Sequence, residues 1–547
     1  MPEIPREPEE CNRFCAMQWQ RTIAALGAAL LSISAVSGCA PAAPGPSATS
    51  PGSSEPSATS PTGEQELPGV EVPLPELAPP ISLADLGGFS GVARLEMGSN
   101  CTGTLIDTGV TDGPAYLITN GHCTGDVGRA AQQVTVGEEW FGKGFFLNTE
   151  DNPTPVVVNA EVLEYSTMRG RDVAIVRLEE TLGYLRGLGL KPVPIIDAEP
   201  AAGTAVRNIA APIQGLVDSE WVLRSGECNL EHQADLVELH WLWQGAWANK
   251  CPGVRQGSSG SPLFTVNADG TPAAIASVIN TTTTGSSPAN GGKCFLNRPC
   301  ELTDGTPTWV EDMSYGVSVA GIGKCFNTAG EFALGGECPL EVSSVVAHQG
   351  GGIFRGGDLP DASHRLPVAD LSLSGPVGTS APVRTILAPL DRSDVCTDPA
   401  TYANAVQATV SAVEHPWDPG LEVPANLPEE EGLFALCAVA NDDYAGAATV
   451  IFQVDRTPPM FQPGASVEGI GEGNIVVNPF LNPPELTTVR FTWLPGDVEC
   501  PATSEFQDFF VIPLMIEASD LPATYCIYGL DQAGNATDVV RMPLVSK

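Results

Sequence analysis

Short apolar runs of β type, separated by glycine, proline, asparagine or aspartate, recur along this 547-residue chain from about residue 81 onward. Many short strands without intervening helical periods are typical of all-β barrels and sandwiches. We therefore expect an all-β protein. The clearest predicted strands are Gly91–Leu95, Gly103–Ile106, Ala115–Thr119, Pro155–Glu164, Val173–Leu178, Ala205–Ile209, Ser261–Val266, Ala273–Ile279 and Ser314–Val319.

Changes in composition divide the chain into several predicted parts. Residues 39–80 are mostly Pro, Ser, Ala and Thr. Such a segment can bury too little apolar surface to offset the entropy lost on ordering, so we expect a disordered tether. Residues 81–345 carry the first folded domain. Two segments with β patterning follow at 350–457 and 458–547, joined near Thr457-Pro458-Pro459, and they look like tandem Ig-like or fibronectin-like β-sandwich domains of bacterial surface proteins.

The N-terminus has the features of an export signal. Arg21 precedes an uncharged, mostly apolar stretch, Thr22–Gly38, which is too short for a convincing membrane span. It ends in Val-Ser-Gly-Cys39, which resembles the lipobox of bacterial lipoproteins, in which the cysteine is lipidated. We predict a lipoprotein signal peptide at 1–38, translation starting at Met17, and export to an outward-facing, lipid-anchored position. An ordinary secretory signal with an incidental cysteine is the alternative.

Cysteine usage also points to an oxidising compartment. With Cys11 and Cys15 in the signal region and Cys39 lipidated, twelve of the 15 cysteines remain, and they fall along the chain as near neighbours. None has zinc-ligand spacing with histidine, so we expect no metal. Proximity predicts six disulfides: Cys101–Cys123, Cys228–Cys251, Cys294–Cys300, Cys325–Cys338, Cys396–Cys437 and Cys500–Cys526.

The charge balance excludes one class of partner. Sixty-five acidic residues against 26 basic ones give a formal charge of −39. Such a surface repels phosphate backbones, so we expect no binding of nucleic acid.

Two segments offer a histidine and an aspartate at strand ends. Leu117–Cys123 leads from a strand into a turn that presents His122 beside Cys123, and the predicted disulfide to Cys101 would hold that turn rigidly. Asp172 begins a hydrophobic strand, where a carboxylate at the rim of a buried site can orient an imidazole. Taken singly, a capping or core histidine and a turn-capping aspartate are open alternatives.

A third segment offers a serine among glycines. In Gln256–Phe264, glycines beside Ser259 allow backbone conformations in which neighbouring N–H groups converge on one point. Such groups form an oxyanion hole, which we assign to the backbones of Gly257 and Ser259. A plain flexible loop is the alternative, although the following Pro-Leu-Phe favours a strand.

His122, Asp172 and Ser259 follow one another at intervals of 50 and 87 residues. With their flanking segments, they resemble the three signature blocks of the chymotrypsin/trypsin family of serine endopeptidases. The resemblance covers about residues 88–345. It implies two six-stranded β-barrels with the site between them, Ser259 as nucleophile, His122 as general base and then acid, Asp172 as orienting partner, and no cofactor.

Some positions depart from the family pattern. Ser258 stands where many members carry an aspartate that pairs with a newly cut N-terminal amine, and no Ile-Val-Gly-Gly cleavage site precedes Gly91. We therefore expect an enzyme that is not activated by that salt bridge. Gly-Ser-Ser-Gly-Ser-Pro is closer to bacterial lysyl-endopeptidase-like and glutamyl-endopeptidase-like members than to digestive trypsins.

Substrate preference is less well defined by the sequence. By the resemblance, Gly253 lies at the base of the primary pocket and brings no charge there. Arg255 either borders the pocket or is a solvated loop residue, and Ser277 supports the Asp172 carboxylate.

Two further segments have no predicted catalytic role. We interpret the Trp-rich stretch between Cys228 and Cys251 as a loop, with His232 and His240 either bordering the cleft or packed. Residues 281–339 are expected to lie beyond the protease core.

The leading interpretation is therefore a serine endopeptidase that acts on proteins or peptides. Two alternatives remain at this stage: a catalytically retired protease domain used for binding, and a surface adhesin. The C-terminal modules would then bind a surface or matrix partner.

Overall fold

The computed structural model describes residues 74–125, 133–285, 294, 296–414, 418–460, 462–480, 485–508 and 513–545. The predicted signal peptide 1–38, the start at Met17, Cys39 and most of the tether lie outside the described residues. In the described ranges, no helix is both long enough and apolar enough to span a bilayer.

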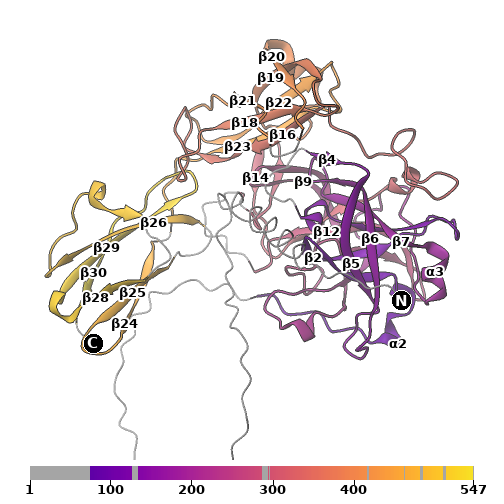
Figure 1. Ribbon diagram of the computed structural model, residues 1–547, viewed down its shortest axis with the longest axis horizontal. Coiled ribbons are helices and arrows are strands. Elements are labelled where there is room, and N and C mark those ends of the chain that lie inside the picture. The colour runs from indigo at the N-terminus through magenta and orange to yellow at the C-terminus, as the bar shows by residue number, and fades with distance from the viewer. Residues whose placement is uncertain are drawn as a thin grey trace, which may run out of the picture. The chain divides into compact units, whose positions relative to one another are not determined.

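The first barrel is built from the N-terminal strands, drawn in indigo and violet in Figure 1. In spatial order it comprises β6, β5, β1, β2, β3 and β7, and the pairing of β6 with β7 closes the ring; the short β4 (Val134–Thr135) adds to β6. Leu95, Leu117 and Phe146 are fully buried inside it. The bounds are β1 Val92–Met97, β2 Ser99–Leu105, β3 Pro114–Thr119, β5 Glu138–Phe146, β6 Val156–Thr167 and β7 Val173–Thr181.

The second barrel closes in the same way. The order is β10, β15, β12, β11, β8 and β9, with β9 pairing back to β10, while β13 (Cys300–Thr303) and β14 (Thr306–Thr308) extend the sheet from β9. The bounds are β8 Ala205–Ala210, β9 Arg224–Glu238, β10 Trp241–Asn249, β11 Pro262–Val266, β12 Pro272–Thr282 and β15 Ser314–Ser318. Within the described residues, each ring has six strands, as predicted.

The segment between Cys228 and Cys251 was predicted wrongly as a loop. It forms most of the β9–β10 hairpin, and Trp241 and Trp243 stack with ring centroids 5.8 Å apart in the core. The indoles are therefore core side chains of a strand. His232 pairs with Glu301 on the surface, and burial lowers the pKa of His240 to about 4.

The prediction that residues 281–339 lie beyond the protease core was also wrong. β12 continues to Thr282, and β15 pairs with both β12 and β10, so the barrel closes only through this segment. An insertion that carries β13, β14 and the Cys294–Cys300 disulfide lies between β12 and β15. It separates these two paired barrel strands widely in the sequence.

Helices are short in this part of the chain. α2 covers Leu83–Leu86 and begins at Ser82, whose hydroxyl accepts the N–H of Asp85. α3 covers Leu182–Gly187 after β7, with Thr181 as its N-cap. A 3₁₀ turn, η2, covers Gly121–Thr124 and carries His122.

Two β-sandwich modules follow. In the first, a sheet of β16, β18 and β21 faces a sheet of β17, β23, β22, β19 and β20 across a core that includes Leu371, Leu436 and Phe452. The bounds are β16 Val345–Gly350, β17 Gly352–Phe354, β18 Val368–Leu373, β19 Ser380–Pro389, β20 Val406–Ser411, β21 Leu421–Pro424, β22 Gly432–Ala440 and β23 Ala448–Val454.

The second module, in orange and yellow in Figure 1, has a sheet of β24, β25 and β28 and a sheet of β27, β26, β29 and β30. Its core includes Ile475, Tyr525 and Ile527. The bounds are β24 Gly464–Gly469, β25 Ile475–Phe480, β26 Leu486–Pro495, β27 Gln507–Asp508, β28 Leu514–Ile516, β29 Ala523–Asp531 and β30 Val540–Leu544. The fold class is all-β, as expected from the recurrence of short strands.

The cysteines join in the six pairs predicted from proximity: Cys101–Cys123, Cys228–Cys251, Cys294–Cys300, Cys325–Cys338, Cys396–Cys437 and Cys500–Cys526. Disulfide-rich folds persist in oxidising compartments, so this set fits an extracellular protein.

Candidate active site

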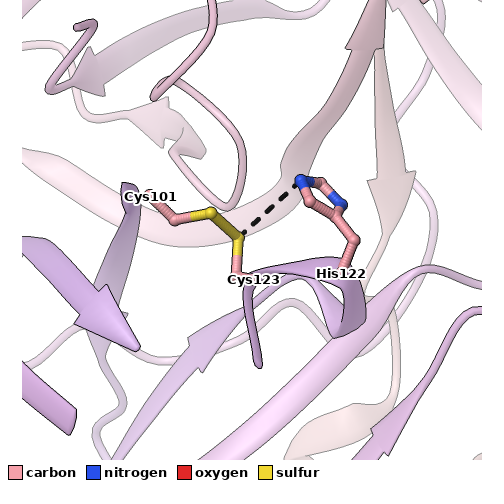
Figure 2. A group of neighbouring side chains, drawn as sticks. All are labelled: Cys101, His122 and Cys123. Carbon is pink, nitrogen blue, oxygen red and sulfur yellow. Dashed lines mark hydrogen bonds between the residues drawn. A yellow bond between two sulfur atoms is a disulfide. The ribbon is translucent and has the colours of Figure 1, made fainter. Parts of the chain in front are cut away.

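His122 lies on the η2 turn directly after β3. Cys123, the next residue, is joined to Cys101 on β2, so the turn is tied to the neighbouring strand. Figure 2 shows the imidazole directed towards this disulfide, with Nε2 lying 3.9 Å from Cys123 Sγ. The disulfide therefore fixes the backbone of the turn that carries the histidine.

Asp172 lies between β6 and β7 and is completely buried. One carboxylate oxygen, Oδ2, is 2.6 Å from His122 Nδ1, and the other, Oδ1, accepts the backbone N–H of His122 at 3.0 Å. The Asn120 side chain donates to the Asp172 carbonyl oxygen at 2.8 Å. A Cβ at Gly121 would lie 2.1 Å from the Thr167 carbonyl oxygen, so only glycine allows this approach.

Two opposing effects set the pKa of His122. Burial lowers the pKa because it disfavours the imidazolium, whereas the charge of Asp172 and its hydrogen bond raise it. Glu238 adds a smaller effect in the same direction, and the net result is a raised pKa. The imidazolium is thus stabilised by a buried carboxylate that also orients the ring.

Ser259 lies in the loop just before β11, and this loop is held by β2. The backbone N–H of Thr102 donates to the Ser259 carbonyl oxygen at 2.8 Å, and the Thr102 hydroxyl donates to the Gly257 carbonyl oxygen at 3.0 Å. Because Thr102 follows the disulfide-bonded Cys101, the serine loop and the histidine turn are attached to the same short stretch of β2.

The backbone of the serine loop leaves two donors free. Among the described residues, the N–H groups of Gly257 and Ser259 donate to no protein acceptor, whereas that of Ser258 donates to the Arg255 carbonyl oxygen at 2.9 Å. Gly257 has φ of 97°, a conformation that glycine adopts without strain. The two free donors are those assigned from the sequence to an oxyanion hole.

Ser259 and His122 are not hydrogen-bonded to each other. In the part of the chain that the structure describes, the Ser259 hydroxyl makes no hydrogen bond. Both side chains are partly exposed, and the segments that carry them are both held by β2. Catalytic hydrogen bonds are often long in structures without substrate and tighten only in the complex.

Three residues differ from the sequence-based interpretation. Gly253 does not border open space, since a Cβ there would lie 2.3 Å from the Ala78 backbone nitrogen. The Arg255 guanidinium donates to the carbonyl oxygens of Pro75 and Gln214, so this partly exposed side chain is held by the loops around it. The Ser277 hydroxyl is buried without a hydrogen-bond partner among the described residues, so it does not support Asp172.

Two residues of the site were missed from the sequence. Thr102 was given no role from the sequence, because no local motif marks a hydroxyl that bridges two distant segments. Glu238, at the end of β9, is 3% exposed. Burial raises its pKa to about 7, although hydrogen bonds from the Thr281 side chain and the Asn297 N–H lower the pKa in part. A glutamate that ends a largely apolar run, Leu236-Val237-Glu238, was the available signal.

One cluster has the proximity of a metal site but not its chemistry. Cys101, His122 and Cys123 offer ligand atoms within 4.8 Å of one another. Both sulfurs are bound in the disulfide and supply no thiolate. These residues do not fit a metal ion.

Comparison with known proteins identifies the domain. Residues 101–275 match the family model of the trypsin-like peptidase domain. The chain carries a trypsin-like peptidase domain. The match begins within β2 and ends within β12, so it leaves out β1 and β15, and it includes His122, Asp172 and Ser259. No curated protein matches the sequence.

Solved structures of proteases are similar to part of this chain. A thermostable serine protease, AL20, from an extremophilic microorganism has 17% identity and a TM-score of 0.28, over 42% of this chain and 92% of its own. Protease Anisep from Arthrobacter nicotinovorans has 13% identity and a TM-score of 0.29, over 47% and 98%. The scabies mite inactivated protease paralogue S-I1 has 16% identity and a TM-score of 0.27, over 45% and 95%.

Proposed function

We propose that the trypsin-like domain is an endopeptidase that cleaves peptide bonds through an acyl-enzyme on Ser259. The Ser259 hydroxyl attacks the scissile carbonyl carbon while His122 Nε2 accepts its proton. The resulting imidazolium gives that proton to the leaving amine. Water then attacks the acyl-enzyme with the same base, which returns Ser259 to its free form. No cofactor takes part.

Asp172 and the serine loop assist these steps. Asp172 accepts from His122 Nδ1–H, which leaves Nε2 as the basic nitrogen, and it stabilises the imidazolium. The free N–H groups of Gly257 and Ser259 donate to the oxyanion of the tetrahedral intermediate. Because these donors are fixed before substrate arrives, little reorganisation is needed when charge develops.

The hydrogen bonding of Asp172 is the observation that carries the proposal. A fully buried carboxylate that binds both Nδ1 and the backbone N–H of one histidine is an arrangement suited to orienting a general base. The free donors beside Ser259 favour a working enzyme over a domain retained only for binding.

Hydrolysis of a peptide library by the full chain tests the proposal. Wild-type protein should cleave internal peptide bonds, and Ser259→Ala should lose cleavage by about 10⁶-fold. Ser219→Ala is a matched control, since Ser219 is an exposed serine of the same domain. Equal cleavage by wild type and Ser259→Ala would reject the assignment.

We further propose that the protein is exported and lipid-anchored through Cys39, with residues 39–80 as a tether ahead of the protease domain at 81–345. The apolar stretch before Cys39 and the six disulfides support this location. The sandwich modules, at 350–457 and 458–547, would bind a surface or matrix partner. Cys39→Ala should move the protein from the membrane fraction to the soluble fraction; unchanged fractionation would reject the anchor.

A further inference from the structure

A segment from outside the two barrels holds the loop that precedes Ser259. We call residues 74–81 the N-terminal strap. The Arg255 side chain donates to the Pro75 carbonyl oxygen through Nε at 2.9 Å and through Nη2, and to the Gln214 carbonyl oxygen through Nη1 at 3.2 Å. One guanidinium thus joins the strap to the serine loop and to the loop after β8.

The strap is itself fixed to the second barrel. The Ile81 N–H donates to the Leu223 carbonyl oxygen, and the Ser225 N–H donates to the Pro79 carbonyl oxygen, both at 3.0 Å. The Arg224 side chain donates to the Ala78 carbonyl oxygen at 3.1 Å. Ala78 and Ile81 are buried. These contacts make the strap a rigid support.

The strap packs closely against the serine loop at Gly253. A Cβ at this position would lie 2.3 Å from the Ala78 nitrogen and 3.0 Å from the Ala78 Cβ. The φ of Gly253 is also positive, at 77°. The loop therefore follows a path that requires glycine and places it in direct contact with the strap.

Arg255 also organises the backbone of the turn that leads to Ser259. Its carbonyl oxygen accepts the Ser258 N–H at 2.9 Å, and its own N–H donates to the Ser258 hydroxyl at 3.2 Å. The following carbonyl, of Gln256, accepts the Ile213 N–H at 2.8 Å. This turn determines where the N–H groups of Gly257 and Ser259 point.

We propose that the uncut N-terminal strap, held by Arg255, positions the oxyanion-hole donors Gly257 and Ser259. This inference rests on the proposed function for its catalytic consequence. Gly253, Gly257 and Gly260 all have positive φ, so the free loop has many accessible conformations. An oxyanion hole requires donors fixed before the reaction, and the strap supplies that constraint. Cleavage within the strap would therefore lower activity.

The test uses the full chain with Arg255→Ala and Arg255→Lys. Arg255→Ala should lower kcat by about 10- to 100-fold with little change in KM, because the oxyanion donors act mainly in the transition state. Added guanidinium chloride, below denaturing concentration, should restore part of the loss. Arg255→Lys, which keeps the charge but loses the forked donors, should be intermediate. Arg392→Ala, an exposed arginine of the first sandwich module, is the control.

Hydrogen exchange of the peptide that contains Gly257 and Ser259 gives a readout independent of activity. Exchange in this peptide should be faster in Arg255→Ala than in wild type. If the wild type is inactive but exchange is still faster in Arg255→Ala, the proposed function is rejected and the role of the strap in holding the loop is retained. Wild-type kcat and unchanged exchange in Arg255→Ala would reject the strap. If Arg255→Ala does not fold, the same comparisons with Arg255→Lys decide.

Discussion

Both carboxylate oxygens of Asp172 accept hydrogen bonds from His122, one from the ring at 2.6 Å and one from the backbone N–H at 3.0 Å. The aspartate therefore controls both the rotation of the imidazole and the position of the turn that carries it. The disulfide from Cys101 to Cys123 restrains the other side of the same turn.

Replacing Asp172 by asparagine should damage catalysis far more than stability. The amide would favour the tautomer with the proton on Nε2, so the ring could not accept the serine proton, and kcat should fall on the order of 10⁴-fold. Steady-state kinetics with a peptide substrate measures the change, and the thermal midpoint measures folding. A loss below about tenfold in a folded variant would contradict the role of Asp172.

The pH profile should report the raised pKa of His122. The base works only when neutral, so kcat/KM should rise with pH along a limb whose midpoint lies above 6.5, the ordinary pKa of histidine. The groups that shift it are Asp172 and, more weakly, Glu238. By linkage, the stabilisation from the charged His122 is complete below pH 6.5 and is lost as pH rises through the raised pKa. A limb centred below 6.5 would contradict this electrostatic account.

Glu238 should make stability depend on pH in a defined window. Burial raises the pKa of Glu238 to about 7 in the folded protein, against an ordinary value of 4.5 for glutamate, so the folded state holds the proton more tightly. Stability from this group is therefore complete below pH 4.5 and declines as pH rises towards 7. Glu238→Gln should flatten that decline in urea unfolding. Glu227→Gln, at an exposed position on the same strand, should keep the decline of stability with pH. If stability fell equally with pH in the wild type and both variants, the burial of the Glu238 carboxyl would be contradicted.

Thr102→Val should weaken the support of the serine loop. The hydroxyl donates to the Gly257 carbonyl oxygen and accepts the Ala211 N–H, so its removal leaves two buried groups unpaired and costs about 1–3 kcal/mol. Urea unfolding should show this loss together with a lower kcat. Thr104→Val is the matched control on β2, because the buried Thr104 hydroxyl has no hydrogen-bond partner among the residues that the structure describes. Equal effects of the two substitutions would contradict the bridging role.

Much of the fold and site could be predicted because the signals are local. The segments around His122, Asp172 and Ser259 each combine a strand with a chemically distinctive residue, and their order distinguishes this arrangement from other folds with the same triad. The disulfides could be paired because each cysteine has a near neighbour in sequence.

Other features depend on contacts between distant segments. The Thr102 bridge spans 155 residues to Gly257, and Arg255 reaches 180 residues back to Pro75, so neither partner has a local pattern. The β9–β10 hairpin did have a local sequence pattern, since Trp241 and Trp243 are two residues apart and lie on one face of β10. Polar residues such as His232 and Gln233 obscured the alternation in β9.

The most direct test of the account is the site of covalent modification by a fluorophosphonate. The full chain should be labelled, and peptide mass spectrometry should find one adduct, on Ser259. Ser259→Ala should remain unlabelled, while Ser219→Ala should label like wild type. Failure of the folded wild-type protein to react, or an adduct on a different residue, would contradict the assignment of Ser259 as the nucleophile.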